Sequence, residues 1–306
     1  MIVFAASGKG GVGQSVTSCN LAYRLSLHGI STAYVDFDLG SPSAGAVFEI
    51  GSVDSGAETG NGLHSYLLGH DSIHRRVDVR ASTHRKALHS RRSRGAALVL
   101  LPGDEGCGEA VSANDRQVVR RCRELLLDLD STFKVVIVDL SAGRSVAMQI
   151  ALEATRPLDM PDNEVYWLVY HRWTRQHLMS AKRVVHGPKG LLARAVELGY
   201  GLDDLLARIR FVRTAVPCVT GEHAAGGGPQ AAWLLKQHDV LRSLAAEYRL
   251  GDSVSLGEVP VDRLLQWREQ IVLDADVGAG IANWATVVAF DNLARRLVDR
   301  ATWVPV

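Results

Sequence analysis

The sequence predicts an α/β protein with one doubly wound, mainly parallel β-sheet flanked by helices. Short apolar runs alternate with longer amphipathic stretches along the 306 residues, as in parallel strands joined by crossover helices. A glycine-rich loop follows the first apolar run directly. Hydrophobic residues make up 47% of the chain, which is enough for one large core. No linker or internal repeat divides the sequence, so we expect a single domain over residues 1–306.

Seven apolar runs are the expected strands. Several are rich in Val, Ile and Tyr, which is typical of central strands that are buried on both faces. The expected strands span residues 2–6, 32–37, 97–101, 134–138, 165–170, 209–212 and 253–256.

Five longer segments are the expected helices. The first begins at Ser15 and closes at Gly29. In the second, Val118, Cys122 and Leu125 recur at helical spacing, which predicts one buried face. The expected helices span residues 15–28, 115–129, 174–185, 230–248 and 280–300.

A basic segment around residues 75–95 interrupts this alternation. A run of this kind usually forms a solvated, mobile loop, which is our expectation here. A patch that binds a polyanion such as DNA is the alternative. The net charge of the whole chain is only +1, so no global field attracts nucleic acid or an anionic membrane. The basic residues of the segment are Arg75, Arg76, Arg80, Arg85, Lys86, Arg91, Arg92 and Arg94.

Cysteine usage and hydropathy bear on the cellular location. The four cysteines form no C-x-x-C pair, which argues against a zinc site or a disulfide framework and favours a reducing cytoplasm. No run of about eighteen apolar residues occurs, and Pro305 stops any terminal amphipathic helix. We therefore expect a cytoplasmic protein that does not bind a membrane.

The strongest motif is a candidate phosphate-binding loop, Gly8-Lys9-Gly10-Gly11-Val12-Gly13-Gln14-Ser15, between the first expected strand and the first expected helix. Glycines allow successive backbone N–H groups to point into one concave nest that holds phosphate oxygens. The spacing matches the pattern G-x-x-x-x-G-K-[ST], except that Gln14 stands at the lysine position. Ser15 would supply a hydroxyl group to Mg²⁺.

This loop resembles the deviant Walker A motif, KGGVGK[ST], of the MinD/ParA family of P-loop ATPases. Other segments resemble the same family in the same order, so the resemblance covers almost the whole chain. They are the D-x-D strand at 34–38, the helix at 62–69, the strand at 98–103, the Walker B strand at 135–139 and the G-x-I-P-x-D turn at 257–262.

The resemblance implies that the chain binds ATP and Mg²⁺ and forms a homodimer that sandwiches the nucleotides. Lys9 would reach the partner subunit's nucleotide, and Asp38 would polarise the attacking water. Asp36 would support the metal shell, and Asp139 would hold Mg²⁺ through a water, although carboxylates at strand ends also serve as helix caps. The implied catalytic residues are Lys9, Gln14 and Asp38. The implied nucleotide-binding residues are Gly8, Lys9, Gly10, Gly11, Val12, Gly13, Gln14, Ser15, Val16, Arg213, Pro260, Val261 and Asp262. The implied metal-site residues are Ser15, Asp36, Asp38 and Asp139.

Three positions depart from the family pattern. Gln14 carries no charge to neutralise the β- and γ-phosphates, and losing such a contact costs about two to three orders of magnitude in rate, so we expect poor hydrolysis. Either a natural relative has lost catalysis or a lysine was replaced to trap a bound state; the intact Ser15 and aspartates favour the second. Arg213 stands where the family often has an Asn that reads adenine, and it would stack on a base. The turn at 140–143 lacks the usual proline.

Two classes of function follow. The leading hypothesis is an ATP-dependent dimeric switch that positions a cargo or regulates a partner protein, with hydrolysis impaired by Gln14. The alternative is a non-hydrolysing scaffold of the same fold that recruits a partner protein. Non-specific DNA is a further candidate partner. An iron–sulfur carrier on this fold would need a cysteine pair at the dimer face, which the sequence does not offer.

Overall fold

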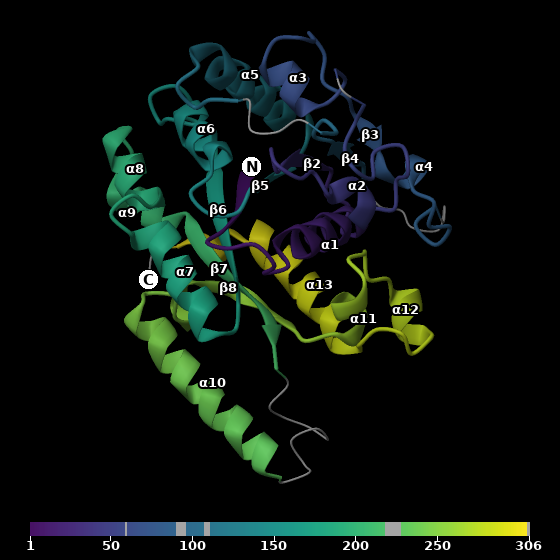
Figure 1. Ribbon diagram of the computed structural model, residues 1–306, viewed down its shortest axis with the longest axis vertical. Coiled ribbons are helices and arrows are strands. Elements are labelled where there is room, and N and C mark those ends of the chain that lie inside the picture. The colour runs from purple at the N-terminus through teal and green to yellow at the C-terminus, as the bar shows by residue number, and fades with distance from the viewer. Residues whose placement is uncertain (59, 90–95, 107–110, 218–227, 305–306) are drawn as a thin grey trace.

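A computed structural model describes residues 1–58, 60–89, 96–106, 111–217 and 228–304. Its centre is one sheet with the strand order β3-β4-β2-β5-β1-β6-β7-β8 (Figure 1). All neighbouring strands run parallel except β3, which pairs antiparallel with β4 at the edge. The strands are β1 (Ile2–Ser7), β2 (Thr32–Phe37), β3 (Val77–Asp78), β4 (Leu98–Leu101), β5 (Val135–Leu140), β6 (Val165–Arg172), β7 (Ile209–Val216) and β8 (Ser255–Pro260).

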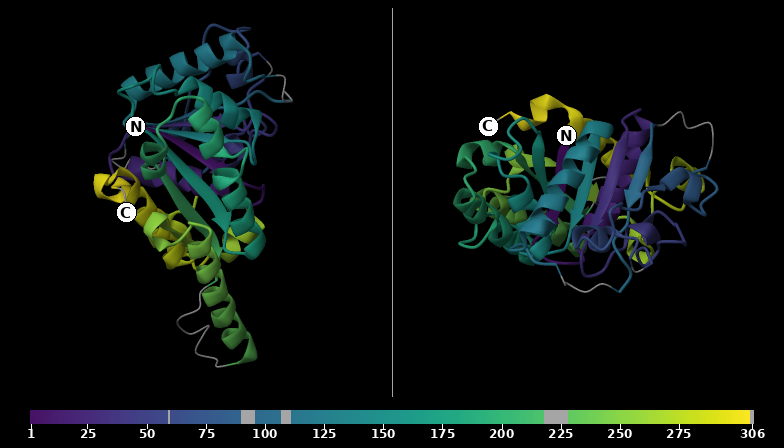
Figure 2. Two further views of the ribbon diagram at one scale, coloured as in Figure 1. Left: turned by 90° about the vertical axis from the view of Figure 1, so that its left-hand side faces the viewer. Right: turned by 90° about the horizontal axis from the view of Figure 1, so that it is seen from above.

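Helices cover both faces of this sheet (Figure 2). One face packs against α3 (Leu63–Leu67), α5 (Arg116–Thr132), α6 (Val146–Ala154), α7 (Arg175–His186), α8 (Leu191–Glu197), α9 (Leu202–Ala207) and the end of α10 (Pro229–Glu247). The other face packs against α1 (Gln14–Leu27), α2 (Ala44–Val47), α4 (Val79–Ser82), α11 (Arg263–Trp267), α12 (Asp274–Gly278) and α13 (Trp284–Val298). Short 3₁₀ turns follow at Asp252–Val254 and Arg300–Trp303.

The alternation of side chains along each strand divides the core in two. In β1, Ile2, Phe4 and Ala6 enter one hydrophobic cluster, whereas Val3 and Ala5 enter the other. This is the period-two pattern of a strand that is buried on both faces. The sheet thus fixes the carboxyl end of β1 between β5 and β6, where the glycine-rich loop begins.

The predicted fold class is confirmed, and all seven expected strands and all five expected helices are present with ends shifted by up to about four residues. The sequence reading missed β3 and several helices, mostly of four to seven residues, which are too short for a periodic pattern to mark them. It also missed α6, because nearly all of its side chains are apolar and six of its nine residues are buried.

The basic segment is partly ordered by contacts with the rest of the chain. Its described part, residues 75–89, forms β3, α4 and turns. Arg85 donates to both carboxylate oxygens of Asp276 at 2.7 and 2.6 Å. Contrary to the expectation of a solvated loop, this residue is therefore held against the rest of the protein. Arg91, Arg92 and Arg94 lie outside the described residues, and mobility stays a prediction.

Among the described residues, no helix has the length and apolar character needed to cross a bilayer.

Core packing of α13 gives a test of this arrangement. Phe290 is 0% exposed, whereas Trp284 on the same helix is 63% exposed. Phe290→Ala should therefore lower the free energy of unfolding by about 3–5 kcal/mol because it leaves a cavity. Trp284→Ala is the matched control, with an expected change of about 0.5 kcal/mol or less. Equal effects in urea unfolding would contradict the packing of α13 on the sheet.

Candidate functional site

The glycine-rich loop connects β1 to α1 at the carboxyl ends of the central strands, where open α/β sheets bind ligands. Gly11 and Gly13 have φ angles of 72° and 75°, in the left-handed region that favours glycine. Gly8 passes so close to α7 that an added Cβ would lie 2.4 Å from the Ser180 carbonyl oxygen. Glycine is therefore required at these three positions for steric reasons, before any ligand is considered.

Neighbouring strands hold this loop on both sides. From β7, the Thr214 hydroxyl donates to the Val12 carbonyl oxygen at 2.6 Å. Beyond β5, the Gly143 amide donates to the Ser7 carbonyl oxygen at 2.7 Å. The loop is thus positioned by the sheet, which leaves its backbone amides preorganised for a ligand.

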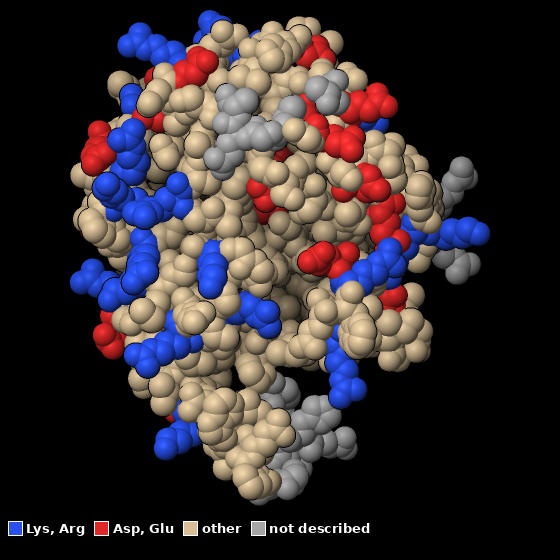
Figure 3. Space-filling view, viewed as in Figure 1, with Lys and Arg blue, Asp and Glu red and all other residues tan. Residues whose placement is uncertain are grey.

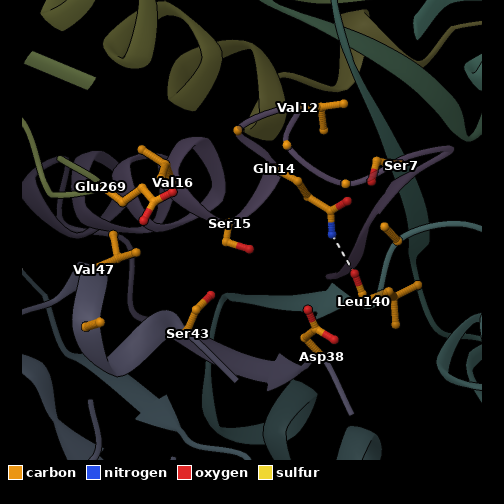
Figure 4. Close-up of a pocket in the computed structure, with 15 residues that line it drawn as sticks. Ser7, Val12, Gln14, Ser15, Val16, Asp38, Ser43, Val47, Leu140 and Glu269 are labelled. Carbon is orange, nitrogen blue, oxygen red and sulfur yellow. Dashed lines mark hydrogen bonds between the residues drawn. The ribbon is translucent and has the colours of Figure 1, made fainter. Parts of the chain in front are cut away.

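Two adjoining cavities open against the loop. One, of about 250 Å³, is bounded by the loop, α2 and the end of β5, and the side chains of Ser15, Asp38 and Ser43 face it (Figure 4). The second, of about 320 Å³, is bounded by the loop and by the turn after β8. The expected residues Pro260, Val261 and Asp262 line this second cavity.

Gln14 points away from the phosphate nest and into the sheet. Its Nε2 lies 2.7 Å from Asp139 Oδ1, 2.7 Å from the Leu140 carbonyl oxygen and 3.0 Å from the Ala5 carbonyl oxygen. Figure 4 draws the contact with Leu140. The resemblance implied that Gln14 binds the nucleotide, whereas its amide hydrogens are directed to β1 and β5. Gln14 Oε1 is buried and has no hydrogen-bond partner among the described residues.

Tyr34 is a site residue that the sequence reading missed. Its hydroxyl donates to Asp139 Oδ2 at 2.7 Å, and the ring is fully buried. Together with Gln14, it occupies both oxygens of the Walker B carboxylate. Its spacing in the sequence could have identified it. Tyr34 and Asp36 are two residues apart on β2, so their side chains face the same side of the strand.

Asp36 and Asp139 form a buried carboxylate pair beneath the loop. They are 2% and 1% exposed and lie opposite one another in the register of β2 and β5. Burial, reinforced by the charge of Asp139, raises the pKa of Asp36 to about 8. Burial also raises the pKa of Asp139, although hydrogen bonds from Gln14 and Tyr34 act in the opposite direction. Among the described residues, no cationic side chain forms an ion pair with either carboxylate.

The four implied metal-site residues are neighbours, with Ser15 a hydrogen-bond partner of Asp139 and Asp38 next to Asp36, but they lie at two depths. Ser15 and Asp38 line the first cavity, whereas Asp36 and Asp139 lie beneath it. Asp36 accepts the amide hydrogen of Ala44 at 2.8 Å and thus caps α2, which is the alternative role considered for such residues. In the described part of the chain, no three His, Cys, Asp or Glu side chains form a metal-binding group. A Mg²⁺ ion in the first cavity would thus depend on Ser15, Asp38 and the nucleotide's own phosphates.

The expectation for Arg213 is wrong. Its guanidinium group pairs with Asp252 at 2.7 Å and lies 4.5 Å from the centre of the Trp173 ring. The side chain is buried and lines neither cavity. Because the positive charge already has a carboxylate and an aromatic face as partners, it is not available to stack on a base.

Two exposed residues border the site. Lys9 is exposed and does not line the first cavity. Trp267, at the end of α11, is 88% exposed and adjoins Gln266 and Glu269, which line the second cavity. An aromatic side chain of that size beside a ligand cavity is typical of a surface that a partner covers.

Basic residues gather on one side of this face (Figure 3). No Asp or Glu occurs between Glu164 and Glu197, a stretch that includes α7 and holds six Lys and Arg residues. Arg144 and Arg183 line a cavity of about 450 Å³ next to Gly8, and neither has an ion-pair partner among the described residues. A basic surface separate from residues 75–89 therefore lies beside the loop (Figure 3).

Comparisons with known proteins agree with this geometry. Residues 1–65 match a family model described as ParA, NUBPL iron-transfer P-loop NTPase. A segment of 49 residues is 49% identical to an iron-sulfur cluster carrier protein of Pseudomonas fragi, and this match covers 16% of the chain and 17% of that relative.

Three solved structures match almost the whole chain. MinD in the MinC:MinD complex of Aquifex aeolicus is 15% identical, with a TM-score of 0.61 and coverage of 97% of this chain and 95% of that one. A plasmid partition protein of Borrelia burgdorferi B31 bound to AMPPNP is 15% identical, with a TM-score of 0.59 and 98% of each chain covered. MinD of Pyrococcus horikoshii with Mg-ADP is 17% identical, with a TM-score of 0.56 and coverage of 98% and 96%.

The loop, its place in the sheet and the strand order define a P-loop nucleotide-binding fold. More specifically, the fold is similar along almost the whole chain to solved MinD and plasmid partition structures, and residues 1–65 match the ParA family model.

The raised pKa of Asp36 predicts a pH dependence of stability. The folded state holds a proton up to about pH 8 that the unfolded chain releases near pH 4. This contribution to stability is therefore fully present below about pH 4 and is lost as the pH rises to 8, by at most about 1.4 kcal/mol per pH unit. Asp36→Asn should flatten the slope, measured by urea unfolding in EDTA between pH 5 and 8. The exposed Asp54→Asn is the control, and an unchanged slope in Asp36→Asn would rule out this origin.

Proposed function

We propose that this chain is an ATP-binding switch of the MinD/ParA type that forms a nucleotide-sandwich homodimer and hydrolyses ATP poorly. The observation that carries the proposal is the contact between Gln14 and Asp139, at the position where a phosphate loop normally offers a lysine. The loop keeps the glycines and backbone amides that phosphate binding needs. The side chain at position 14, which would promote hydrolysis, instead donates to Asp139.

Nucleotide binding is supported by the loop itself. Its left-handed glycines and the start of α1 direct backbone amides toward one point, which suits an anion. The adjoining cavities would take the phosphates beside Ser15 and the base beside Pro260 and Val261. Ser15 and Asp38 would hold Mg²⁺, which supplies charge neutralisation to the phosphates when bound.

Impaired hydrolysis follows from the absence of a cation at position 14. A transferring phosphoryl group spreads negative charge over its oxygens, and a lysine in this loop stabilises that charge. Gln14 is uncharged and donates to Asp139 and Leu140. Asp139 in turn accepts one hydrogen bond on each oxygen, so Gln14 and Tyr34 share its lone pairs with any metal-coordinated water.

The sandwich dimer is supported by what surrounds the cavities. Lys9 is exposed at the mouth of the loop, and the neighbouring Trp267 is 88% exposed. Closing a second copy over this face would bury the tryptophan and bring Lys9 to the partner's phosphates. The similarity in fold to the MinC:MinD complex supports the expectation of a protein partner.

Three other roles are DNA binding, a scaffold without turnover and an iron–sulfur carrier. Non-specific DNA is a second proposed partner, favoured by the basic surface over α7 (Figure 3). A scaffold without turnover is the alternative to a switch. An iron–sulfur carrier, the function named for the Pseudomonas fragi relative, lacks support because Cys19 and Cys122 are buried on separate helices. Cys107 and Cys218 lie outside the described residues.

Restoring the lysine tests the switch directly. Gln14→Lys should raise Mg²⁺-dependent ATP turnover by about 10²–10³-fold, because it returns one charge contact to the transition state. Phosphate release measured at saturating ATP is the readout. Gln14→Met, which can neither donate nor carry charge, is the matched control and should stay inactive. A lysine variant that binds ATP without turnover would favour the scaffold, and failure of both chains to bind ATP would overturn the proposed site.

The exposed lysine tests the dimer. Lys9→Ala should weaken ATP-dependent dimerisation by at least about tenfold if its charge reaches the partner's nucleotide. Sedimentation with a non-hydrolysable ATP analogue is the measurement. Lys134→Ala, an exposed lysine at the opposite end of β5, should have no effect. Equal dimerisation of the two variants would contradict the assigned role of Lys9.

A further inference from the structure

Glu269 borders both cavities beside the glycine-rich loop. The cavities, of about 250 and 320 Å³, share five lining residues. Four of them, Gly11, Val12, Gly13 and Val16, belong to the loop and to the first turn of α1. The fifth is Glu269, which follows α11 in the sequence. In the described part of the chain, Glu269 is therefore the one residue from outside the loop and α1 that lies where the two cavities meet.

The segment after Glu269 is tied to α1. The Gln270 carbonyl oxygen accepts a hydrogen bond from Asn20 Nδ2 at 3.0 Å, and the Val272 amide donates to Asn20 Oδ1 at 2.7 Å. Asn20 lies on α1 and is fully buried. The backbone next to Glu269 is thus held against the same helix that begins at the glycine-rich loop. This contact fixes the distance between Glu269 and the loop before any ligand binds.

Glu269 has an unused carboxylate, whereas the other charged groups of the second cavity are less suited to accept a hydrogen bond. Asp262 is 3% exposed, and its Oδ2 already accepts from the Asn283 amide at 2.9 Å and the Thr286 hydroxyl at 2.7 Å. Arg172 also lines this cavity, but a guanidinium group can only donate. Glu269 is exposed, and no residue in the described ranges forms an ion pair or a hydrogen bond with its side chain.

We propose that Glu269 accepts hydrogen bonds from the 2′- and 3′-hydroxyl groups of the bound nucleotide's ribose, so that the site selects ribonucleotides over deoxyribonucleotides. The assignment rests on the proposed function, which puts the phosphates in the first cavity and the base in the second. Because the ribose links these two parts, it has to cross the boundary beside Glu269. The two carboxylate oxygens match the two neighbouring hydroxyl groups, and a charged acceptor strengthens both hydrogen bonds. A carboxylate has the same role toward ribose in dinucleotide-binding folds.

The position of Glu269 within the first cavity agrees with a role at the sugar. Figure 4 shows Glu269 at the end of the cavity that Val16 and Val47 line, on the other side of Ser15 from Asp38. The ribose end of the nucleotide would lie toward Glu269, and its terminal phosphates toward Asp38. This direction keeps the carboxylate of Glu269 away from the most negative part of the ligand, since repulsion between like charges falls with distance.

The sugar preference of nucleotide binding tests this assignment. Dissociation constants of ADP and 2′-deoxy-ADP, neither of which has a γ-phosphate to lose, are measured with Mg²⁺ by equilibrium dialysis. The native chain should bind ADP about five- to tenfold more tightly, because the deoxy sugar lacks one hydrogen bond to a charged acceptor. Glu269→Ala should bring this ratio to about one, and Glu269→Gln, whose amide oxygen still accepts, should leave it at about two to three.

Two variants are matched controls. Glu258→Gln replaces an exposed glutamate on β8 that borders neither cavity, and it should keep the native ratio. Gln266→Ala alters a residue that borders the second cavity alone, and it should change the affinity for both nucleotides by the same factor. Because each ratio compares two sugars on one protein, any general effect of a variant on folding or phosphate binding cancels.

Several results would overturn the role of Glu269. Equal affinity of the native chain for ADP and 2′-deoxy-ADP would do so and would leave the proposed nucleotide site intact, as would a native ratio that persists in Glu269→Ala. A loss of affinity in Glu269→Ala that is equal for both sugars and disappears in EDTA would instead make Glu269 a residue of the Mg²⁺ site. A native chain that binds neither ADP nor ATP would contradict the proposed function together with this assignment.

Discussion

The burial of two carboxyl groups beneath the glycine-rich loop is the constraint on which the rest of the site depends. Asp36 and Asp139 need a cation, hydrogen-bond donors or a retained proton, because an uncompensated buried charge is costly, and Asp36 keeps its proton up to about pH 8. Most phosphate loops of this pattern have a lysine at the position of residue 14, which could supply the cation, but this chain has glutamine there. The chain compensates with neutral donors: Gln14 and Tyr34 on Asp139, and the α2 amide on Asp36. These hydrogen bonds stabilise the two buried carboxyl groups in the protein without ligand.

The loop is held in place by contacts that do not involve the side chain at position 14. Gly8 is pressed against α7, Thr214 holds Val12, and Gly143 holds Ser7, so the loop is supported from three directions. Because these contacts come from the backbone and from neighbouring strands, they are independent of the residue at position 14. Binding and turnover can therefore separate in this fold, as a switch held in one state or a scaffold would require.

Much of the fold could be predicted from sequence because central parallel strands are continuous apolar runs. The runs at 2–6 and 32–37 correspond closely to β1 and β2, and the loop was evident from its glycines. The direction of Gln14 could not be predicted, since it is set by Asp139, which is 125 residues away. Arg213 was misjudged for the same reason, because Trp173 and Asp252 determine where its charge lies. Tyr34 was missed because a buried tyrosine in a strand is usually read as core.

The chemical state of the bound nucleotide tests the central claim most directly. The chain is mixed with limiting radiolabelled ATP and Mg²⁺, isolated by rapid filtration, and its bound nucleotide is separated at intervals from minutes to hours. If Gln14 leaves binding intact and removes turnover, intact ATP stays bound over the whole period. Conversion of the bound ATP to ADP within seconds to a minute would contradict the account, because a neutral residue at position 14 would then suffice for hydrolysis.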